Sequence, residues 1–402
     1  MNLSENANLR LKKFSGLSLV LAALGFYLKS KTSTEENREN QVYLKKLVRQ
    51  VNEAGLAWKA KYNPFGARAK DFNFPVEKNV TAIQQSVDDL NRFFASEHMQ
   101  LHLRELANFP TESLPTFFDA REKWPHCSSI SEVYNQGGCG SCYAVAAVGV
   151  AADRTCIHSN GSINTLFSEE DVLGCCAVCG NCFGGDPLKA LVYWVNEGLV
   201  TGGRDGCRPY SVDIECGVPC SPAQYPFNEY KRKCTRRCQS IYFQNSYEDD
   251  KRYASIAYSM YPRTMSLDKK GRNRIKVPTV IGHFNDTEGP LSNEQIRQII
   301  MKELYLSGPT TLAFPVTEEF LHYSSGIFSP YPVEDFAKRI VYWHVVKLIG
   351  WGQYNNGQHY WLAVNSFGRH WGDSGESPKA WVFKIDTSMV EDFGLEYETG
   401  LP

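Results

Sequence analysis

The chain has 402 residues, of which 43% are hydrophobic, 13% aromatic and 22% charged. At about 150 residues per domain, this length allows one large domain or two to three ordinary ones, and the composition excludes a disordered or collagen-like chain. The formal net charge is −1, so no global basic excess indicates a nucleic-acid partner, and we expect none.

Residues 1–30 have the pattern of a signal peptide, with three basic residues before an apolar run from Phe14 to Leu28. The 15 residues of the run fall short of the roughly 20 that cross a bilayer, which favours a cleaved signal peptide over a retained anchor. We therefore expect a protein of the secretory pathway, lysosomal or extracellular, that contacts a membrane only if this segment is kept as an anchor. Three sequons are then candidate glycosylation sites, at Asn79, Asn160 and Asn285.

The character of the sequence changes near Leu114. Residues 31–113 contain no cysteine and carry the apolar spacing of amphipathic helices, as in Val42–Val51 and Ile83–Phe94, which predicts a small helical domain. From Leu114 onward, short mixed segments separated by Gly, Pro and Cys indicate an α+β domain. Strand-like apolar runs lie at Thr310–Phe314, Val345–Ile349 and Tyr360–Val364.

The cysteines are confined to one part of the chain. All 13 lie between Cys127 and Cys238, a density typical of a disulfide-bonded domain in an oxidising compartment. An odd number leaves one thiol outside the disulfides. The spacing of Cys176, Cys179 and Cys182 also fits a zinc or iron–sulfur site, but the secretory N-terminus argues against it. We expect no metal and no organic cofactor.

One string predicts a nucleophile. A glycine-rich loop from Asn135 to Gly140 leads into an alanine-rich, helix-forming run that begins near Cys142. The N–H groups and the positive dipole end at the start of a helix favour the thiolate form of a cysteine placed there. Because a thiolate is the nucleophile that covalent catalysis needs, Cys142 is the predicted attacking group.

The residues from Cys139 to Tyr143 read Cys-Gly-Ser-Cys-Tyr, which matches the Cys-Gly-[Ser/Ala]-Cys-[Trp/Tyr] signature of papain-like cysteine peptidases. The expected histidine and asparagine contexts follow downstream. His344 precedes an apolar strand and a Gly-Trp-Gly string, and Asn365 stands after the next strand. The chain is therefore similar to this family in all three parts of its catalytic pattern.

Within that family, residues 114–402 resemble the cathepsin B group. Leu114–Glu122 is similar to the start of its mature enzyme, and Gly206–Ser211 is similar to the beginning of its occluding loop, here residues 207–238. The resemblance implies an α+β, two-lobed papain-like fold with a helical left lobe and a β-barrel-like right lobe. It also implies that residues 31–113 are a short helical propeptide that inhibits the enzyme.

The resemblance assigns a role to each site residue. Cys142 would attack the scissile carbonyl, His344 would accept and return the proton, and Asn365 would orient the imidazole. Gln136 and the backbone N–H of Cys142 would hold the oxyanion. The candidate substrate-binding residues are Gly184, Gly185, Val345 and Glu398. The last of these would accept a basic P2 side chain.

The family's disulfide frame would pair twelve cysteines and leave Cys142. The sequence alone could not select a connectivity, so the resemblance supplies it. The implied pairs are Cys127–Cys156, Cys139–Cys182, Cys175–Cys234, Cys176–Cys179, Cys207–Cys238 and Cys216–Cys220.

The chain departs from cathepsin B around the site. No histidine occurs within residues 207–238, where cathepsin B carries the pair that grips a substrate's C-terminal carboxylate, so we expect an endopeptidase with weak or no carboxydipeptidase activity. Phe367 replaces the tryptophan that shields the Asn–His hydrogen bond. Tyr342 and Trp343 replace two glycines and would narrow the cleft. Residues 252–290 are longer than cathepsin B requires, and no function is assigned to them.

The implied partners are protein or peptide substrates, the chain's own propeptide as inhibitor, and cystatin-type inhibitors. The main alternative is a catalytically weak homologue that uses the cleft to bind peptides or matrix proteins. The presence of both Cys142 and His344 speaks against it, whereas the altered rings around the site support it. A cysteine-rich extracellular structural protein is a third interpretation, but it gives no reason for a thiol in this motif.

Overall fold

The computed structural model describes residues 37–66, 68, 80–212, 232–239, 243–261, 264–266, 274–332, 336–354, 356–369, 371–372, 382–387 and 400–401. Four predicted features lie outside these residues: the signal segment at 1–30, Asn79, the pair Cys216–Cys220, and Glu398. No helix within the described ranges is long and apolar enough to cross a bilayer.

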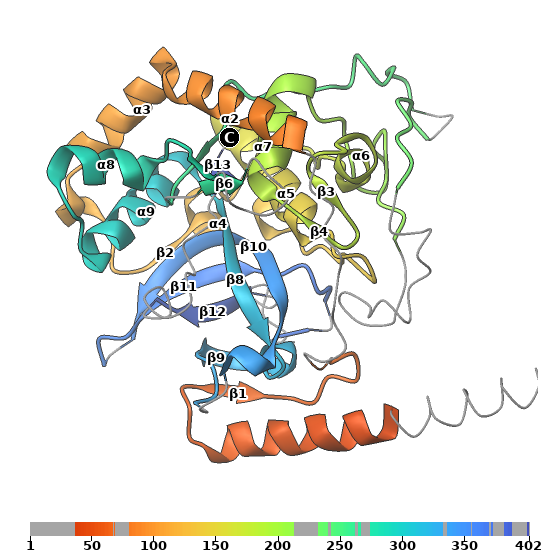
Figure 1. The fold of residues 1–402 in the computed structure, drawn as a ribbon, viewed down its shortest axis with the longest axis vertical. Coiled ribbons are helices and arrows are strands. Elements are labelled where there is room, and N and C mark those ends of the chain that lie inside the picture. The colour runs from red at the N-terminus through yellow and green to blue at the C-terminus, as the bar shows by residue number, and fades with distance from the viewer. Residues whose placement is uncertain are drawn as a thin grey trace, which may run out of the picture.

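One lobe is built around a central helix, α5 (Cys142–His158), with α6 (Glu169–Cys175) and α7 (Pro187–Glu197) beside it (Figure 1). Nearly every residue of α5 is buried, and its many alanines and valines allow neighbours to pack on all sides. The helix α7 begins where Asp186 accepts a hydrogen bond from the N–H of Leu188, and it ends at Gly198, whose φ is 78°. A short hairpin of β3 (Gly180–Asn181) and β4 (Gly184–Gly185) precedes α7.

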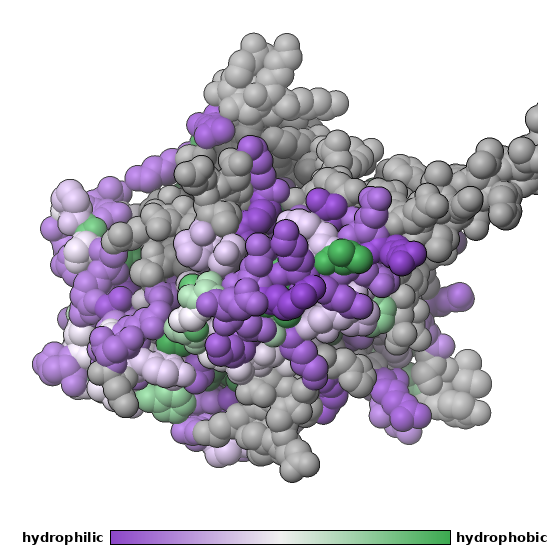
Figure 2. Space-filling view, turned by 90° about the horizontal axis from the view of Figure 1, so that it is seen from below, coloured by the Kyte–Doolittle hydropathy of each residue, from purple (hydrophilic) through white to green (hydrophobic). Residues whose placement is uncertain are grey.

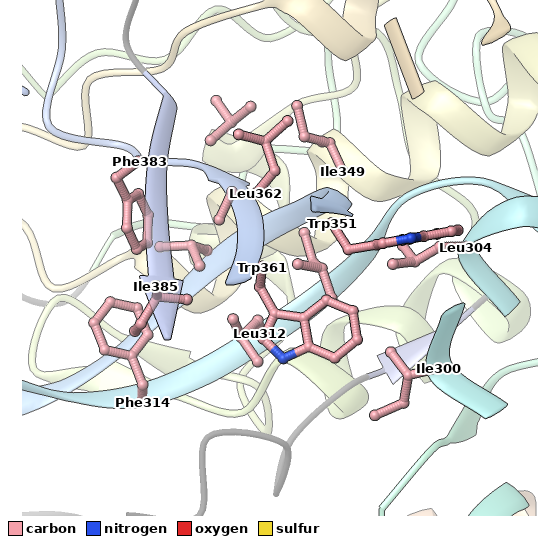
Figure 3. Packing of buried hydrophobic residues seen from close by; sticks show 14 of the residues in the cluster. Ile300, Leu304, Leu312, Phe314, Ile349, Trp351, Trp361, Leu362, Phe383 and Ile385 are labelled. Carbon is pink, nitrogen blue, oxygen red and sulfur yellow. The ribbon is translucent and has the colours of Figure 1, made fainter. Parts of the chain in front are cut away.

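The other lobe is, within the described residues, a seven-stranded sheet of order β1-β9-β12-β11-β10-β2, in which β8 also pairs with β10. Its strands are β1 (Trp58–Ala60), β2 (Phe118–Asp119), β8 (Thr310–Thr317), β9 (Tyr323–Phe328), β10 (Ile340–Gln353), β11 (His359–Val364) and β12 (Val382–Asp386). The three predicted strand-like runs fall within β8, β10 and β11, which confirms them. Figure 3 shows the core, where Trp351 and Trp361 from paired strands lie with Leu312, Phe383 and Ile385.

Several shorter elements complete the described chain. Apart from a helix over residues 37–53, the remaining helices are α2 (Val80–Phe94), α3 (Glu97–Asn108), α4 (Ala120–Lys123), α8 (Val280–Glu288) and α9 (Asn293–Ser307), together with short 3-10 turns at Thr111–Ser113, Ser128–Ser131, Phe320–His322 and Phe336–Arg339. The remaining strands form two pairs, β5 (Tyr258–Ser259) with β13 (Gly400–Leu401) and β6 (Thr264–Ser266) with β7 (Arg274–Lys276).

Disulfides brace the helical lobe. Among the described residues the bonds are Cys127–Cys156, Cys139–Cys182, Cys175–Cys234, Cys176–Cys179 and Cys207–Cys238. Each agrees with the connectivity that the resemblance implied. Because the three sulfurs of the possible zinc or iron–sulfur site are all in disulfides, they cannot serve as thiolate ligands, and that interpretation is wrong.

A buried ion pair joins the two lobes. Lys347 of β10 places its Nζ 2.8 Å from Oδ2 of Asp153 on α5, and both side chains are almost fully enclosed. The same ammonium donates to the carbonyl of Ser129 at 2.9 Å. The helix that begins at Cys142 and the strand that carries His344 are therefore held together by a charge pair shielded from solvent.

The N-terminal segment contacts the rest of the chain in two separate places (Figure 1). A helix over residues 37–53 and the strand β1 lie at the edge of the sheet, where β1 pairs antiparallel with β9. Trp58 is buried there, and its indole N–H donates to the carbonyl of Ser329 at 2.8 Å. Seen from below in Figure 2, this end of the molecule is mainly hydrophilic, because the helix turns its apolar side chains inward. The helices α2 and α3 lie at the opposite end, beside α7, α8 and α9.

A neutral histidine helps to hold the first of these contacts. The backbone N–H of Asn63 donates to Nδ1 of His322 at 2.9 Å, and the Tyr62 ring stacks on the imidazole with a centroid distance of 5.8 Å. Burial lowers the pKa of His322 to about 4. Protonation would place a second N–H where the Asn63 amide needs an acceptor, so the contact depends on the neutral imidazole.

We predict that this contact weakens in acid. The undocked imidazole has a pKa near its ordinary value and binds a proton more readily than the docked one, so docking loses free energy as the pH falls from about 6.5 to about 4. Hydrogen exchange of residues 56–66, followed against pH in a Cys142→Ser background and corrected for intrinsic rates, should show this loss. His322→Asn keeps an acceptor oxygen and cannot titrate, so it should remain protected. Equal pH profiles for the two proteins would contradict the assignment.

A second prediction concerns the ion pair between the lobes. Asp153→Ala leaves the ammonium of Lys347 buried without its carboxylate and should lower the free energy of unfolding by about 3–5 kcal/mol. Urea unfolding with intact disulfides measures this change. The double variant Asp153→Leu with Lys347→Met removes both charges and should recover much of the loss. A single variant as stable as the parent would show that the pair does not hold the lobes together.

Candidate active site

Cys142 is the first residue of α5, and it follows the disulfide-bonded Cys139 by three positions. Ser141, the preceding residue, does not cap the helix with its side chain; its hydroxyl instead hydrogen-bonds the Tyr210 hydroxyl at 2.7 Å. The first-turn N–H groups of α5 are therefore not capped by this hydroxyl, and Cys142 stands at the positive end of the helix dipole. Of the cysteines that the structure describes, Cys142 is the one that keeps a thiol, and 7% of it is exposed.

His344 and Asn365 come from neighbouring parts of the β lobe. His344 lies in β10 opposite Phe314 of β8, and Asn365 follows the last residue of β11. The two side chains are joined by a hydrogen bond of 2.8 Å between His344 Nε2 and Asn365 Oδ1. Because the amide oxygen can only accept, Nε2 carries the proton and Nδ1 has the lone pair of a base. No group among the described residues hydrogen-bonds this Nδ1.

The ring of Tyr342 borders both reacting groups. Its centroid lies 6.0 Å from that of the His344 imidazole in a T-shaped arrangement, and its hydroxyl interacts electrostatically with the Cys142 thiol. The site is closed to solvent at this place: His344 is 0% exposed. Burial lowers the pKa of His344 to about 4, although the hydrogen bond to Asn365 favours the charged form. The imidazole is therefore neutral in the structure at ordinary pH.

Gln136 connects the loop before Cys142 with the loop after Asn365. Its backbone N–H donates to the carbonyl of Ser366 at 2.9 Å, and its Oε1 accepts from the Ser366 hydroxyl at 2.6 Å. Its Nε2 donates one N–H to the carbonyl of Cys139 at 2.9 Å, which leaves a second N–H on the same nitrogen. The side chain is thus fixed on both sides and fully buried.

Aromatic rings enclose the histidine–asparagine bond. Phe367 lies with its centroid 4.7 Å from the His344 ring and at 30° to it. Trp371 packs edge-on against Phe367 at 5.3 Å. Next to them, Trp343 is 56% exposed, because successive side chains of a strand point to opposite faces and Tyr342 and His344 face inward. Of the two rings predicted to narrow the cleft, Tyr342 is the one beside the predicted catalytic residues Cys142 and His344.

The candidate substrate-binding residues differ in their surroundings. Gly184 has φ +126°, a value that requires glycine. A Cβ at Gly185 would collide with the carbonyl of Cys179 and with the Tyr143 ring. The backbone therefore requires glycine at both positions, independently of the predicted contact with substrate. Val345 is buried in the core of the helical lobe.

Two of the candidate glycosylation sites can be placed. Asn160 is exposed in the turn after α5. Asn285 lies within α8, is half-buried, and accepts a hydrogen bond from the N–H of Leu291 at 3.0 Å. Of the two, Asn160 is the more open to modification.

Two supporting residues were not assigned from the sequence. Tyr210 donates to the carbonyl of Gln136 at 2.8 Å as well as contacting Ser141, so it supports the loop on both sides of the glycines. Trp371 backs Phe367. Tyr210 stands within the recognised string that ends at Ser211, but nothing in that string indicates which loop it reaches.

Comparisons with known proteins show the family to which the chain belongs. The family model described as papain family cysteine protease matches residues 114–377. The cathepsin B-like cysteine proteinase 5 of Caenorhabditis elegans is 36% identical over 307 residues, which cover 73% of this chain and 76% of the relative. The cathepsin B-like cysteine proteinase 3 of the same organism is 33% identical over 336 residues, covering 82% and 76%.

Two solved proenzymes share the fold. Procathepsin B S9 of Trypanosoma congolense superposes with a TM-score of 0.58 at 24% identity, covering 89% of this chain and 96% of that one. Digestive procathepsin L2 of Tenebrio molitor gives a TM-score of 0.53 at 18% identity, covering 91% and 90%. The α+β, papain-like fold with an N-terminal helical region agrees with the expectation from the sequence. The chain belongs to the papain family of cysteine proteases, is similar to its cathepsin B-like members, and is a cysteine-type peptidase.

Proposed function

We propose that this protein is the zymogen of a thiol endopeptidase of the endolysosomal or secreted compartment, acting through Cys142, His344 and Asn365. The observation that carries the proposal is the 2.8 Å bond from His344 Nε2 to Asn365 Oδ1. It fixes the proton on one ring nitrogen and leaves the other as a base, while Cys142 stands at the start of α5. A base oriented by a third group, with a thiol that borders the same Tyr342 ring, supports the arrangement that nucleophilic catalysis requires.

The reaction uses the chain's own groups. His344 Nδ1 accepts the proton of Cys142, and the sulfur attacks the carbonyl carbon of the scissile bond. The oxyanion accepts from the remaining N–H of Gln136 Nε2 and from the backbone N–H of Cys142. His344 then gives its proton to the departing amine, and water hydrolyses the thioester with the same imidazole as base.

The described state is suited to a stored precursor. In the proposed propeptide, within residues 31–113, strand β1 pairs with β9. The His344 pKa of about 4 disfavours the imidazolium that must accompany a thiolate. Activation would remove the inhibitory segment. The opened cleft would then take protein or peptide substrates, with cystatin-type inhibitors as competitors.

Endopeptidase rather than carboxydipeptidase activity follows from residues 207–238, which contain no histidine. Without the histidine pair that would bind a terminal carboxylate, a substrate gains nothing from ending two residues beyond the scissile bond. The cleft should therefore cleave internal bonds.

The proposal is tested by titration of the active site. The precursor is expressed in a secretory host, acidified, and treated with an epoxide inhibitor of papain-like enzymes. We expect one label per molecule at Cys142, cleavage of internal bonds in a peptide library, and no label in the Cys142→Ser control. Folded, processed protein that takes up no label would favour the peptide-binding homologue instead. Efficient release of C-terminal dipeptides would reject the endopeptidase assignment.

A further prediction concerns the ring over the catalytic hydrogen bond. Phe367→Ala would admit water to the His344–Asn365 bond, so the pKa of His344 should rise toward its ordinary value and kcat should fall by roughly 10-fold or more. The pH dependence of kcat/KM measures both effects. Phe367→Trp keeps the apolar cover and should retain both the pH profile and most of the rate. An unchanged profile in the alanine variant would show that the ring does not shield the bond.

A further inference from the structure

We propose that α2 and α3 are a permanent part of the mature peptidase and do not leave with the inhibitory segment. They occupy a surface of the catalytic domain that is built from α7, α8, α9 and the extra residues 252–290. This inference rests on the proposed zymogen function, because it states which part of the N-terminal segment is removed. It gives residues 252–290, to which the sequence assigned no function, a role as part of the surface that binds α2 and α3.

The first observation is the position of the two helices. The helix over residues 37–53 and β1 lie against β9 at one end of the molecule, while α2 and α3 lie at the other end (Figure 1). The separation shows that the N-terminal segment is two units with different docking surfaces. One of them can be released without moving the other.

The second observation is the apolar packing of α3. Its residues Met99, Leu103 and Leu106 are buried and belong to one cluster with apolar residues of α8 and α9. Within this cluster Ile300 and Leu304 of α9 lie on the side of Trp361 and Trp351, the centre of the β lobe (Figure 3). Loss of α3 would expose one face of α9, whose other face is part of the core.

The helix α2 makes the corresponding contact with the helical lobe. Its Val87, Leu90 and Phe93 are buried in the cluster that contains α7. At the edge of this contact the Asn196 amide donates to Asp89 Oδ2 at 2.9 Å. The two helices together therefore bridge both lobes of the catalytic domain.

The third observation is a buried charge cluster that α3 completes. Glu303 of α9 is 0% exposed, and its Oε2 lies 2.6 Å from Nε2 of His102 on α3. Its Oε1 accepts from Arg154 of α5 at 3.1 Å and from the Tyr258 hydroxyl of β5 at 3.2 Å. Without His102 the carboxylate would lose one of its two cationic partners and the cover above it. Breaking such a cluster is costly, because a buried charge is left undercompensated.

The extra residues 252–290 form part of the receiving surface. Tyr258, which bonds Glu303, belongs to this stretch, and its ring also packs against His102 at 5.2 Å between centroids. His283 of α8 meets Phe94 at the end of α2, edge to face at 6.2 Å. The β5 and β6 strands of the stretch contact α2. The extra stretch of the catalytic domain and the helices α2 and α3 thus meet at one interface.

His322 and His102 give the two units opposite responses to acid. Burial alone would lower the pKa of His102, but Glu303 raises it above the ordinary value. The charge of Arg154 lowers this pKa and that of Glu105 raises it. His158 is a further titratable group nearby. A raised pKa means that the contact is fully formed below the ordinary pKa and weakens only as the pH rises through the folded one. His322, in contrast, loses its contact in acid. Acid that frees the helix over residues 37–53 and β1 therefore keeps α2 and α3 in place.

The decisive experiment uses the full-length precursor. After acid activation the enzyme is passed through a sizing column at the same pH, and the active peak is analysed by intact mass and peptide mapping. We expect residues 80–108 in the active peak at one copy per catalytic domain, attached or as a separate chain, with residues 37–66 absent. Active, Cys142-labelled enzyme that lacks residues 80–108 overturns the inference while leaving the proposed function intact.

A second arm does not depend on activity. In the Cys142→Ser precursor, inserted sites for a specific protease after Gly66 and after Phe109 allow both junctions to be cut. At pH 5 the fragment with α2 and α3 should stay with the catalytic domain, and the fragment with β1 should separate at pH 4. If α2 and α3 elute alone, the inference is wrong even if no active enzyme was obtained in the first arm.

A point variant links retention to the charge cluster. His102→Ala should raise hydrogen exchange of α3 by roughly 100-fold at pH 5, whereas His98→Ala, an exposed histidine of the same helix, should leave it unchanged. His102→Gln, which keeps a donor to Glu303, is a milder variant if the alanine protein does not fold. Equal hydrogen exchange of α3 in the parent, His102→Gln and His102→Ala proteins would show that the charge cluster does not hold α3 in place.

Discussion

The burial of α5 between the two lobes is the constraint on which the other features depend. A helix surrounded on all sides needs partners for the charged side chains it carries, and two neighbouring residues show how they are paired. Asp153 pairs with Lys347 on the strand of His344, and Arg154 pairs with Glu303 on α9 while also donating to the carbonyl of Pro309. The helix that presents Cys142 is thereby fixed to both the catalytic strand and the outer helix layer. The catalytic geometry follows from this anchoring.

The candidate site could be proposed from the sequence because its residues are marked by local strings. The residues around Cys142, His344 and Asn365 carry short strings that identify them, and the strand pattern at β8, β10 and β11 follows from apolar runs. The five described disulfides agree with a connectivity that only the family resemblance could supply. Periodicity also predicted helices within residues 31–113, but not the surface on which each one packs.

The remaining features could not be predicted because their partners are far apart in the chain. His102 and Glu303 are separated by 201 residues, and Asn63 and His322 by 259. No spacing rule connects such pairs. The stretch at 252–290 is uninformative by itself for the same reason, since several of its contacts are made with helices that precede the catalytic domain. Trp343 is a further example: the sequence placed it beside the cleft together with Tyr342, and only the strand register shows that it faces outward.

The placement of the disulfides makes the two lobes unequal. Every cysteine lies between Cys127 and Cys238, so the sheet that carries His344 and Asn365 beyond residue 310 has no covalent cross-link of its own. Cross-links limit the disorder that an unfolded segment can gain, and packing alone does not. Heat or denaturant should therefore loosen the sheet first. His344 and Asn365 would then lose their fixed positions while the cross-linked lobe that presents Cys142 remains ordered.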